Sequence, residues 1–131
     1  MQSVAKLKNS PHPARKMRLL ADLVRGKSID EALNILRFHN KKLYATQMEK
    51  LIRSAIANWE QKYEDADLED ADLFVKTITV DAGRMLKRIQ PAPQGRAHRV
   101  RKRSNHITVV VENASDVTAE VVEEQQTEEN S

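Results

Sequence analysis

One segment, from residue 85 to residue 103, constrains the fold of this chain more than any other. Its sequence, MLKRIQPAPQGRAHRVRKR, contains no acidic residue. Near its middle, Pro91, Pro93 and Gly95 supply the strongest turn chemistry in the chain. A strongly basic stretch with a turn at its centre is typical of a hairpin. The positive charge of such a hairpin is not balanced by acidic residues within the hairpin itself.

Strand-like sequence flanks this segment on both sides. Residues 73–80 and 107–111 are rich in β-branched side chains, which favour strands. The simplest construction joins these two strands through one long hairpin. Its outer arms would be about 84–90 going out and 96–103 coming back, and at ~3.3 Å per residue each arm would extend roughly 25 Å from the body.

Neither side of this hairpin can be a protein core. Successive residues of a strand point to opposite sides, and both sides of both arms mix cations with apolar groups. A two-stranded ribbon is marginal in water, and each pair of opposed cations destabilises it by up to ~1 kcal/mol. We therefore expect the hairpin to become ordered against a negatively charged partner that surrounds it. A folded RNA can do so, whereas a DNA groove meets only one face.

The remaining sequence predicts a core of three helices on a small sheet. Val4, Ala5 and Leu7 indicate a short first strand. Three amphipathic helices follow, recognised by apolar residues at i, i+3 and i+4 spacing. The first begins after a possible Ser10 cap and ends at Gly26, the second is capped by Ser28 with Glu31 in a capping box, and the third spans roughly 41–62. The apolar stripes comprise Met17, Leu20, Leu23 and Val24; Ile29, Ala32, Leu33 and Leu36; and Met48, Leu51, Ile52, Ala55, Ile56 and Trp59.

We therefore predict an α+β fold: three helices packed on a small antiparallel sheet, with a long protruding β-hairpin. Residues 1–111 would form one domain that includes the hairpin at about 84–103. Residues 112–131 are acidic and polar and are expected to form a disordered tail.

The charge distribution indicates a polyanionic partner. Residues 112–131 hold seven acidic and no basic residues, so residues 1–111 keep 22 basic against 12 acidic residues. These cations occur in separate clusters, whereas a solvated surface usually intersperses both signs. Aromatic side chains are absent from the basic segments, which argues against a base-stacking platform. Recognition of RNA by shape and backbone charge is therefore favoured, with no DNA expected.

Other classes of site find little support. The chain has no cysteine, which excludes disulfides and thiolate chemistry, and it has no apolar run long enough for a membrane span and no apolar core of a signal peptide. A calcium loop at residues 65–76 fails, because its sixth position is Asp70 rather than Gly and its twelfth is Lys76 rather than Glu. No cofactor or metal site is predicted. A cytoplasmic protein is expected.

Six motifs occur in register: RKMRLLADLVRGK (15–27), SAIAN (54–58), VDAG (80–83), KRIQP (87–91), GRAHR (95–99) and KRSNHITVVV (102–111). Together they resemble a known family, that of ribosomal protein number twenty-two of the bacterial large subunit. The resemblance runs from about residue 2 to residue 111. It implies a structural protein, not an enzyme, in the large subunit in the cytoplasm. Its hairpin would be threaded through ribosomal RNA and its tip would lie at the wall of the nascent-chain tunnel.

The resemblance also implies site residues and partners. The expected partners are the large-subunit rRNA, which such proteins bind early in assembly, neighbouring large-subunit proteins and the nascent polypeptide. The resemblance implies that rRNA contacts are made by Arg15, Lys16, Arg18, Arg25 and Lys27 on the body and by Lys87, Arg88, Arg96, Arg99, Arg101, Lys102 and Arg103 on the hairpin. It places Gln90, Pro91, Ala92, Pro93, Gln94 and Gly95 at the tunnel wall.

Two departures and two alternatives accompany this interpretation. Family tips often carry cations where this chain has Ala92 and Gln94, and Pro11-His12-Pro13 is an unusual start for the first helix. A nuclease or phosphoryl transferase would have to use the four histidines, His12, His39, His98 and His106, whose spacing fits neither a metal site nor a catalytic triad. A free-standing nucleic-acid-binding regulator would share the basic surface but would not be found in large subunits.

Overall fold

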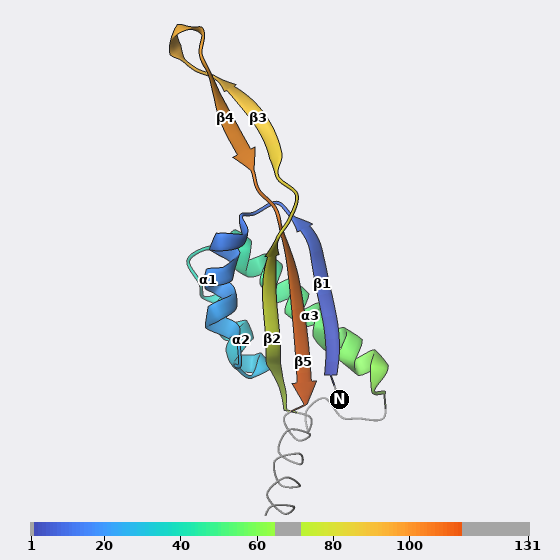
Figure 1. Ribbon diagram of the computed structural model, residues 1–131. Helices are drawn as coiled ribbons and strands as arrows, with labels where there is room; N and C mark the ends of the chain where they lie inside the picture. The colour runs from blue at the N-terminus through green and yellow to red at the C-terminus, as the bar shows by residue number, and fades with distance from the viewer. Residues whose placement is uncertain (1, 65–71, 114–131) are drawn as a thin grey trace, which may run out of the picture.

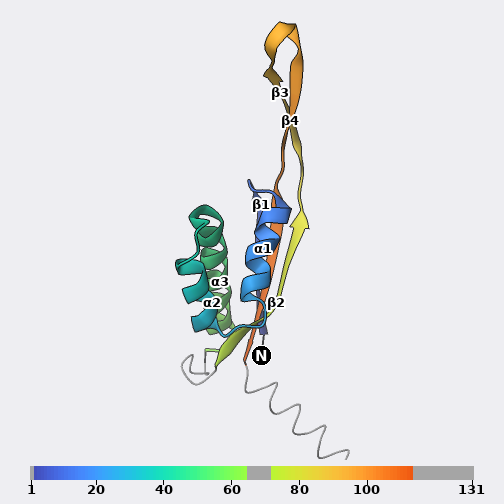
Figure 2. The same ribbon diagram turned by 90° about the vertical axis from the view of Figure 1, so that its left-hand side faces the viewer.

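A computed structural model describes residues 2–64 and 72–113 of the chain. Three helices pack against a three-stranded antiparallel sheet, and a two-stranded ribbon projects from one end of this body (Figure 1). Seen from the side, two of the helices lie clearly on one side of the sheet, whereas the helix at residues 14–24 overlaps the strands and lies beside one edge of the sheet (Figure 1 and Figure 2). The described residues place no helix on the other face. This arrangement confirms the predicted α+β fold and its protruding hairpin.

The helices form where the apolar periodicity predicted them. α1 spans Ala14–Val24, α2 spans Ile29–Arg37 and α3 spans Lys42–Lys62. Met17, Met48 and Trp59 are among the largest fully buried side chains, so the stripes of α1 and α3 meet in the core. Leu23 is the exception in the α1 stripe, because it is 44% exposed and its place in the core is taken by Ala21.

The start of α1 differs from the prediction that Ser10 caps it. Ser10 is the last residue of the first strand, and its hydroxyl donates a hydrogen bond to Oε1 of Gln47 at 2.6 Å. Pro11 and Pro13 explain the difference, because a residue before proline avoids the helical region and proline holds φ near its helix-start value. The helix therefore begins directly after Pro13, which has no side-chain cap hydrogen bond.

The two other predicted helix ends hold. Ser28 caps α2 by accepting the backbone N–H of Glu31 at 3.4 Å, which is one half of the predicted capping box. Gly26 follows the end of α1 with φ of +75°, a conformation that glycine adopts without steric cost. Its N–H donates to the carbonyl of Val75 at 3.0 Å, so the turn after α1 is joined to the sheet.

The sheet has the order β1-β5-β2, with β1 at Gln2–Ser10, β5 at Asn105–Asn113 and β2 at Leu73–Ala82. β1 is longer than the short strand predicted. The side chains that face the helices are those of alternate residues, with one irregularity in β2 between Val75 and Thr77. β5 ends at Asn113, two residues beyond the expected domain boundary at 111.

The hairpin extends outward from the ends of β2 and β5. Its strand pairing is interrupted at its base, which the sequence did not predict. Its ribbon consists of β3 at Leu86–Pro91 and β4 at Ala97–Lys102, joined by the short helical turn η1 at Pro93–Gly95. Residues 83–85 and 103–104 belong to neither sheet, so the ribbon and the three-stranded sheet are separate ladders. The predicted hairpin at about 84–103 is otherwise found.

Two sequence interpretations fall outside the described residues. The acidic segment beyond Asn113 and most of the rejected calcium loop, residues 65–71, are among the residues that the structure does not describe. The third helix ends at Lys62, in agreement with the expected span of roughly 41–62.

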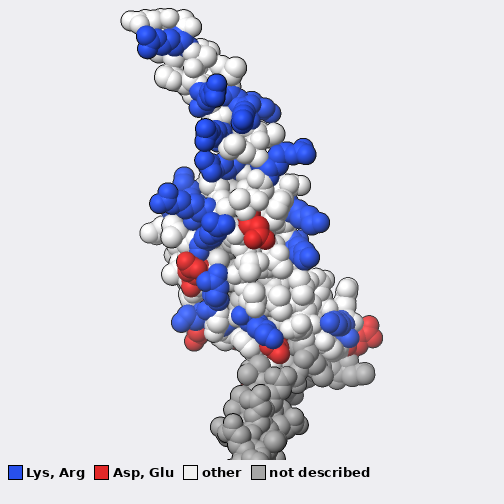
Figure 3. Space-filling view, in the orientation of Figure 1, with Lys and Arg blue, Asp and Glu red and all other residues white. Residues whose placement is uncertain are grey.

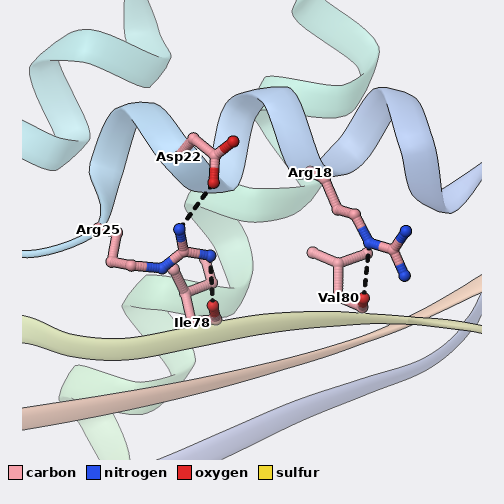
Figure 4. Close-up of polar contacts among 5 residues, drawn as sticks. All are labelled: Arg18, Asp22, Arg25, Ile78 and Val80. Carbon is pink, nitrogen blue, oxygen red and sulfur yellow. Dashed lines mark hydrogen bonds and ion pairs between the residues drawn. The ribbon is translucent and has the colours of Figure 1, made fainter.

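Side chains from α1, from its C-terminal end and from α3 bond to carbonyls at both free edges of the sheet. At the β2 edge, Nε of Arg18 donates to the Val80 carbonyl at 3.1 Å, and an Nη of Arg25 donates to the Ile78 carbonyl at 2.9 Å (Figure 4). At the β1 edge, Asn58 donates to the Val4 carbonyl at 3.2 Å. An exposed strand edge can pair with other chains, and these contacts occupy acceptors that such pairing would need.

Replacing Arg18 with Ala should therefore lower the free energy of unfolding, because the Val80 carbonyl loses its donor. We expect a loss of about 0.5–1.5 kcal/mol in urea unfolding followed by circular dichroism. The matched control is Arg15→Ala on the same helix, which should change the free energy by less than about 0.5 kcal/mol. Equal losses in both variants would show that Arg18 does not support the edge.

Candidate nucleic-acid interface

The register of the ribbon gives each of its faces a set of cations. Lys87 lies directly opposite Arg101, and Ile89 lies opposite Arg99, on one face. Because residues alternate, Arg88 and Lys102 belong to the other face, together with His98. The prediction that both faces carry charge is confirmed. Like charges directly across a ladder destabilise it, so the free ribbon carries built-in repulsion.

The ribbon is exposed along its whole length. Only Val100 among the β3 and β4 residues is even partly covered. Ile89 is 76% exposed, although isoleucine is usually buried. Within residues 2–64 and 72–113, the ion pairs join Arg25 to Asp22, Arg53 to Glu49 and Lys76 to Glu112, so no hairpin cation has an acidic partner there.

The tip is closed by one hydrogen bond and two left-handed residues. The N–H of Ala92 donates to the carbonyl of Arg96 at 2.8 Å. Gln94 and Gly95 follow each other with φ of +65° and +72°. Glycine tolerates this conformation, whereas for Gln94 it costs roughly 1–3 kcal/mol. The six expected tunnel residues, 90–95, thus form the end of the ribbon and the turn that follows it.

The five body cations expected to contact rRNA differ in whether their side chains already bond to other residues of the protein. The side chains of Arg18 and Arg25 already bond to β2, and Arg25 also pairs with Asp22 at 2.7 Å (Figure 4). Arg15, Lys16 and Lys27 are exposed and have no side-chain partner among the described residues. All five lie on α1 or just after it, so they do not share a surface element with the ribbon.

The surface charge is uneven in the view that shows the uncovered sheet face. Lys and Arg gather along the hairpin and on the adjoining end of the body, whereas Asp and Glu occur only on the body (Figure 3). The sequence-level separation of charge therefore corresponds to a separation in space. A positive surface of this kind attracts a polyanion by long-range steering as well as by contact.

Three of the four histidines make local contacts within the protein. The His12 ring packs on Tyr44 with centroids 4.4 Å apart, and Nδ1 of His39 accepts the N–H of Lys41 at 3.1 Å. His98 is exposed on β4, and Nδ1 of His106 accepts the N–H of Asn9 at 3.0 Å. In the described part of the chain, no three His, Asp or Glu side chains gather as metal ligands would.

No helix within residues 2–64 and 72–113 has the length and apolarity needed to cross a membrane.

Sequence reasoning missed one feature, a groove at the base of the hairpin. It is lined by residues from segments that are far apart in the sequence, among them Asn9, Arg84, Arg103 and His106. Arg84 lies in the expected outgoing arm at about 84–90, but the family resemblance does not place it among the rRNA contacts. No spacing rule could have brought Asn9 beside His106, because 97 positions separate them.

Comparison with known proteins identifies the family. The family model described as ribosomal protein L22p/L17e matches residues 5–112. A protein of Flavobacterium psychrophilum named large ribosomal subunit protein uL22 is 59% identical over 115 residues, which cover 88% of this chain and 83% of that protein. The proteins of the same name from Christiangramia forsetii and Bacteroides fragilis are 64% and 54% identical, covering 82% and 86% of this chain and 78% and 81% of their own lengths.

These matches confirm the resemblance inferred from the sequence motifs. They also confirm the expectations of a non-enzymatic protein and of a location in the large subunit of the cytoplasmic ribosome. The matched region includes the three helices, both ladders and the hairpin tip. The chain belongs to the ribosomal protein L22p/L17e family, a family of structural proteins of the large ribosomal subunit.

Proposed function

We propose that this protein binds large-subunit rRNA through its hairpin, supports assembly of the subunit, and lines the nascent-peptide tunnel with its tip. One observation carries the proposal: the ribbon exposes cations on both faces, and none has an acidic partner in the described residues. Ribose-phosphate backbone supplies the missing negative charge.

The two-sided charge favours a partner that encloses the ribbon. The face with Lys87 and Arg101 and the face with Arg88 and Lys102 point in opposite directions. A duplex groove would leave one of them in solvent, whereas folded RNA offers phosphates on several sides. The exposed Ile89 also fits this environment, because unstacked bases and sugar edges provide apolar contact that water does not.

The body cations would add a second contact. Arg15, Lys16 and Lys27 are free to bind phosphates, whereas Arg18 and Arg25 must share their hydrogen bonds with the sheet edge. The body and the hairpin could thus bind separate parts of the RNA. Neighbouring ribosomal proteins would be further partners.

The tip is suited to a wall position rather than to tight RNA binding. Between Gln90 and Gly95 it carries no charged side chain. The nascent polypeptide is therefore the proposed partner of residues 90–95.

Each face of the ribbon should contribute separately to RNA affinity. One double variant, Lys87→Ala/Arg101→Ala, removes two cations from one face. The other, Arg88→Ala/Lys102→Ala, removes two cations from the opposite face. Filter binding to large-subunit rRNA at several salt concentrations should give a slope of log affinity against log salt that is shallower by about 1.5 in each, since each phosphate contact contributes about 0.7–0.9. Lys87 and Arg101 are directly opposed, and Arg88 and Lys102 lie on one face. Removing either pair therefore lowers repulsion and should not destabilise the ribbon further.

The control for both is Lys50→Ala with Arg53→Ala, two exposed cations on α3. This variant should keep the wild-type slope. A slope reduced by only one of the two ribbon variants would contradict an enclosing partner and would favour a groove that meets a single face.

The tunnel position of the tip can be tested with a unique thiol, because the chain has no cysteine. Gln94→Cys should cross-link to a cysteine in a stalled nascent chain within assembled ribosomes. Lys50→Cys on α3 serves as the control and should not cross-link. Equal yields from both positions would contradict a tunnel-lining tip. A protein absent from large subunits on gradient fractionation would instead support a free-standing regulator.

A further inference from the structure

The base of the hairpin holds a groove that adjoins one face of the ribbon, the face that carries Leu86 and Lys102. Its volume is about 680 Å³, and the body contributes Asn9 and His106 to its lining. The hairpin side contributes Arg84, Lys102 and Arg103, and Ser104 lies at the junction. The groove therefore spans the point where the separate ladders of ribbon and sheet meet.

A backbone contact sets the tautomer of His106. The N–H of Asn9 donates to Nδ1 of the ring at 3.0 Å, so in the neutral ring the proton resides on Nε2. Asn9 can make this contact because it adopts φ of +58°, a conformation that asparagine tolerates better than most residues. The ring thus presents an N–H donor that no hydrogen bond among the described residues uses.

Local bonds hold the junction in place around that ring. The N–H of Gly83 donates to the Ser104 carbonyl at 2.8 Å, and the Ser104 hydroxyl donates to the Arg84 carbonyl at 2.6 Å. A Cβ at Gly83 would lie 2.6 Å from Oγ of Ser104 and 3.2 Å from Nε2 of His106. A side chain at Gly83 would therefore require the Ser104 hydroxyl to move and the His106 ring to shift by a few tenths of an ångström.

The charge of the groove is positive. Arg84, Lys102 and Arg103 have no ion-pair partner among the described residues, and no acidic side chain is part of the lining. Asp81 lies opposite His106 in the sheet register, but it is exposed and does not line the groove. Three cations and one neutral donor without a carboxylate favour an anion with several acceptor oxygens.

We propose that this groove binds a single phosphate group, with the Nε2–H of His106 as a neutral donor and Arg84, Lys102 and Arg103 as its charge partners. The proposal rests on the proposed RNA-binding function, which makes a backbone phosphate of the RNA the supplier, although a free phosphate ion shares the chemistry. Because body and hairpin both line the groove, a phosphate bound there fixes the angle at which the hairpin leaves the body.

Two substitutions of His106 separate the Nε2–H donor from the Nδ1 acceptor that holds Asn9. His106→Asn keeps an acceptor near the position of Nδ1 for Asn9 and loses the donor at Nε2, whereas His106→Gln keeps a donor near Nε2. Filter binding to large-subunit rRNA should show an affinity about 2- to 10-fold weaker for His106→Asn. Its salt slope should be unchanged, because no cation is removed, and His106→Gln should bind close to wild type.

Arg103→Ala provides the charged counterpart, with Lys50→Ala as its control. Its slope should be shallower by about 0.7–0.9, and that of the control should not change. Wild-type affinity in His106→Asn would overturn the site. Equal weakening in His106→Asn and His106→Gln would also overturn it, since a donor near Nε2 would then make no difference to binding.

A titration with inorganic phosphate tests the site without RNA. Nuclear magnetic resonance of the whole protein should show saturable shifts of the His106 ring nitrogens and the Ser104 amide, and His106→Asn should lose the Ser104 response. The same shifts with sodium chloride at matched ionic strength would overturn the site. Saturable phosphate shifts in a protein that fails to bind rRNA would leave the groove standing and remove the proposed function, so the two failures are distinguishable.

Discussion

Repulsion between cations that the protein itself does not neutralise is the constraint on which the account depends. Lys87 faces Arg101 across a two-stranded ladder, and the faces of that ladder bury no core. Such a ribbon has few apolar contacts to offset the entropy of ordering it. In the proposed function, phosphate backbone supplies the stability that the ribbon lacks, because its negative charge suits both faces.

The body has a different constraint, because its three-stranded sheet has two free edges. Some of its arginines are used at one of these edges, since Arg18 and Arg25 bond to carbonyls of β2. The basic side chains of the body therefore fall into two groups. Some bond to the edge of the sheet, and others remain free to bind a partner. The carbonyls that these side chains occupy are no longer available to pair with a strand of another chain.

The sequence predicted the parts of the structure that depend on local chemistry. The stripe from Met48 to Trp59 has helical period, and Pro91, Pro93 and Gly95 dictate a turn whatever surrounds them. The cap assigned to Ser10 failed because a tertiary contact with Gln47 and two prolines outweighed a local preference. The groove could not be predicted, since it depends on Asn9, Gly83 and His106, which only the folded sheet brings together.

Amide hydrogen exchange along the hairpin tests the central claim most directly. In the free protein, the amides of β3 and β4 should exchange far faster than those of β5, because the ribbon opens locally without unfolding the body. Bound to large-subunit rRNA, the same amides should become strongly protected while β5 changes little. Ribbon amides that are as protected as β5 in the free protein, with no further protection on adding RNA, would contradict the account.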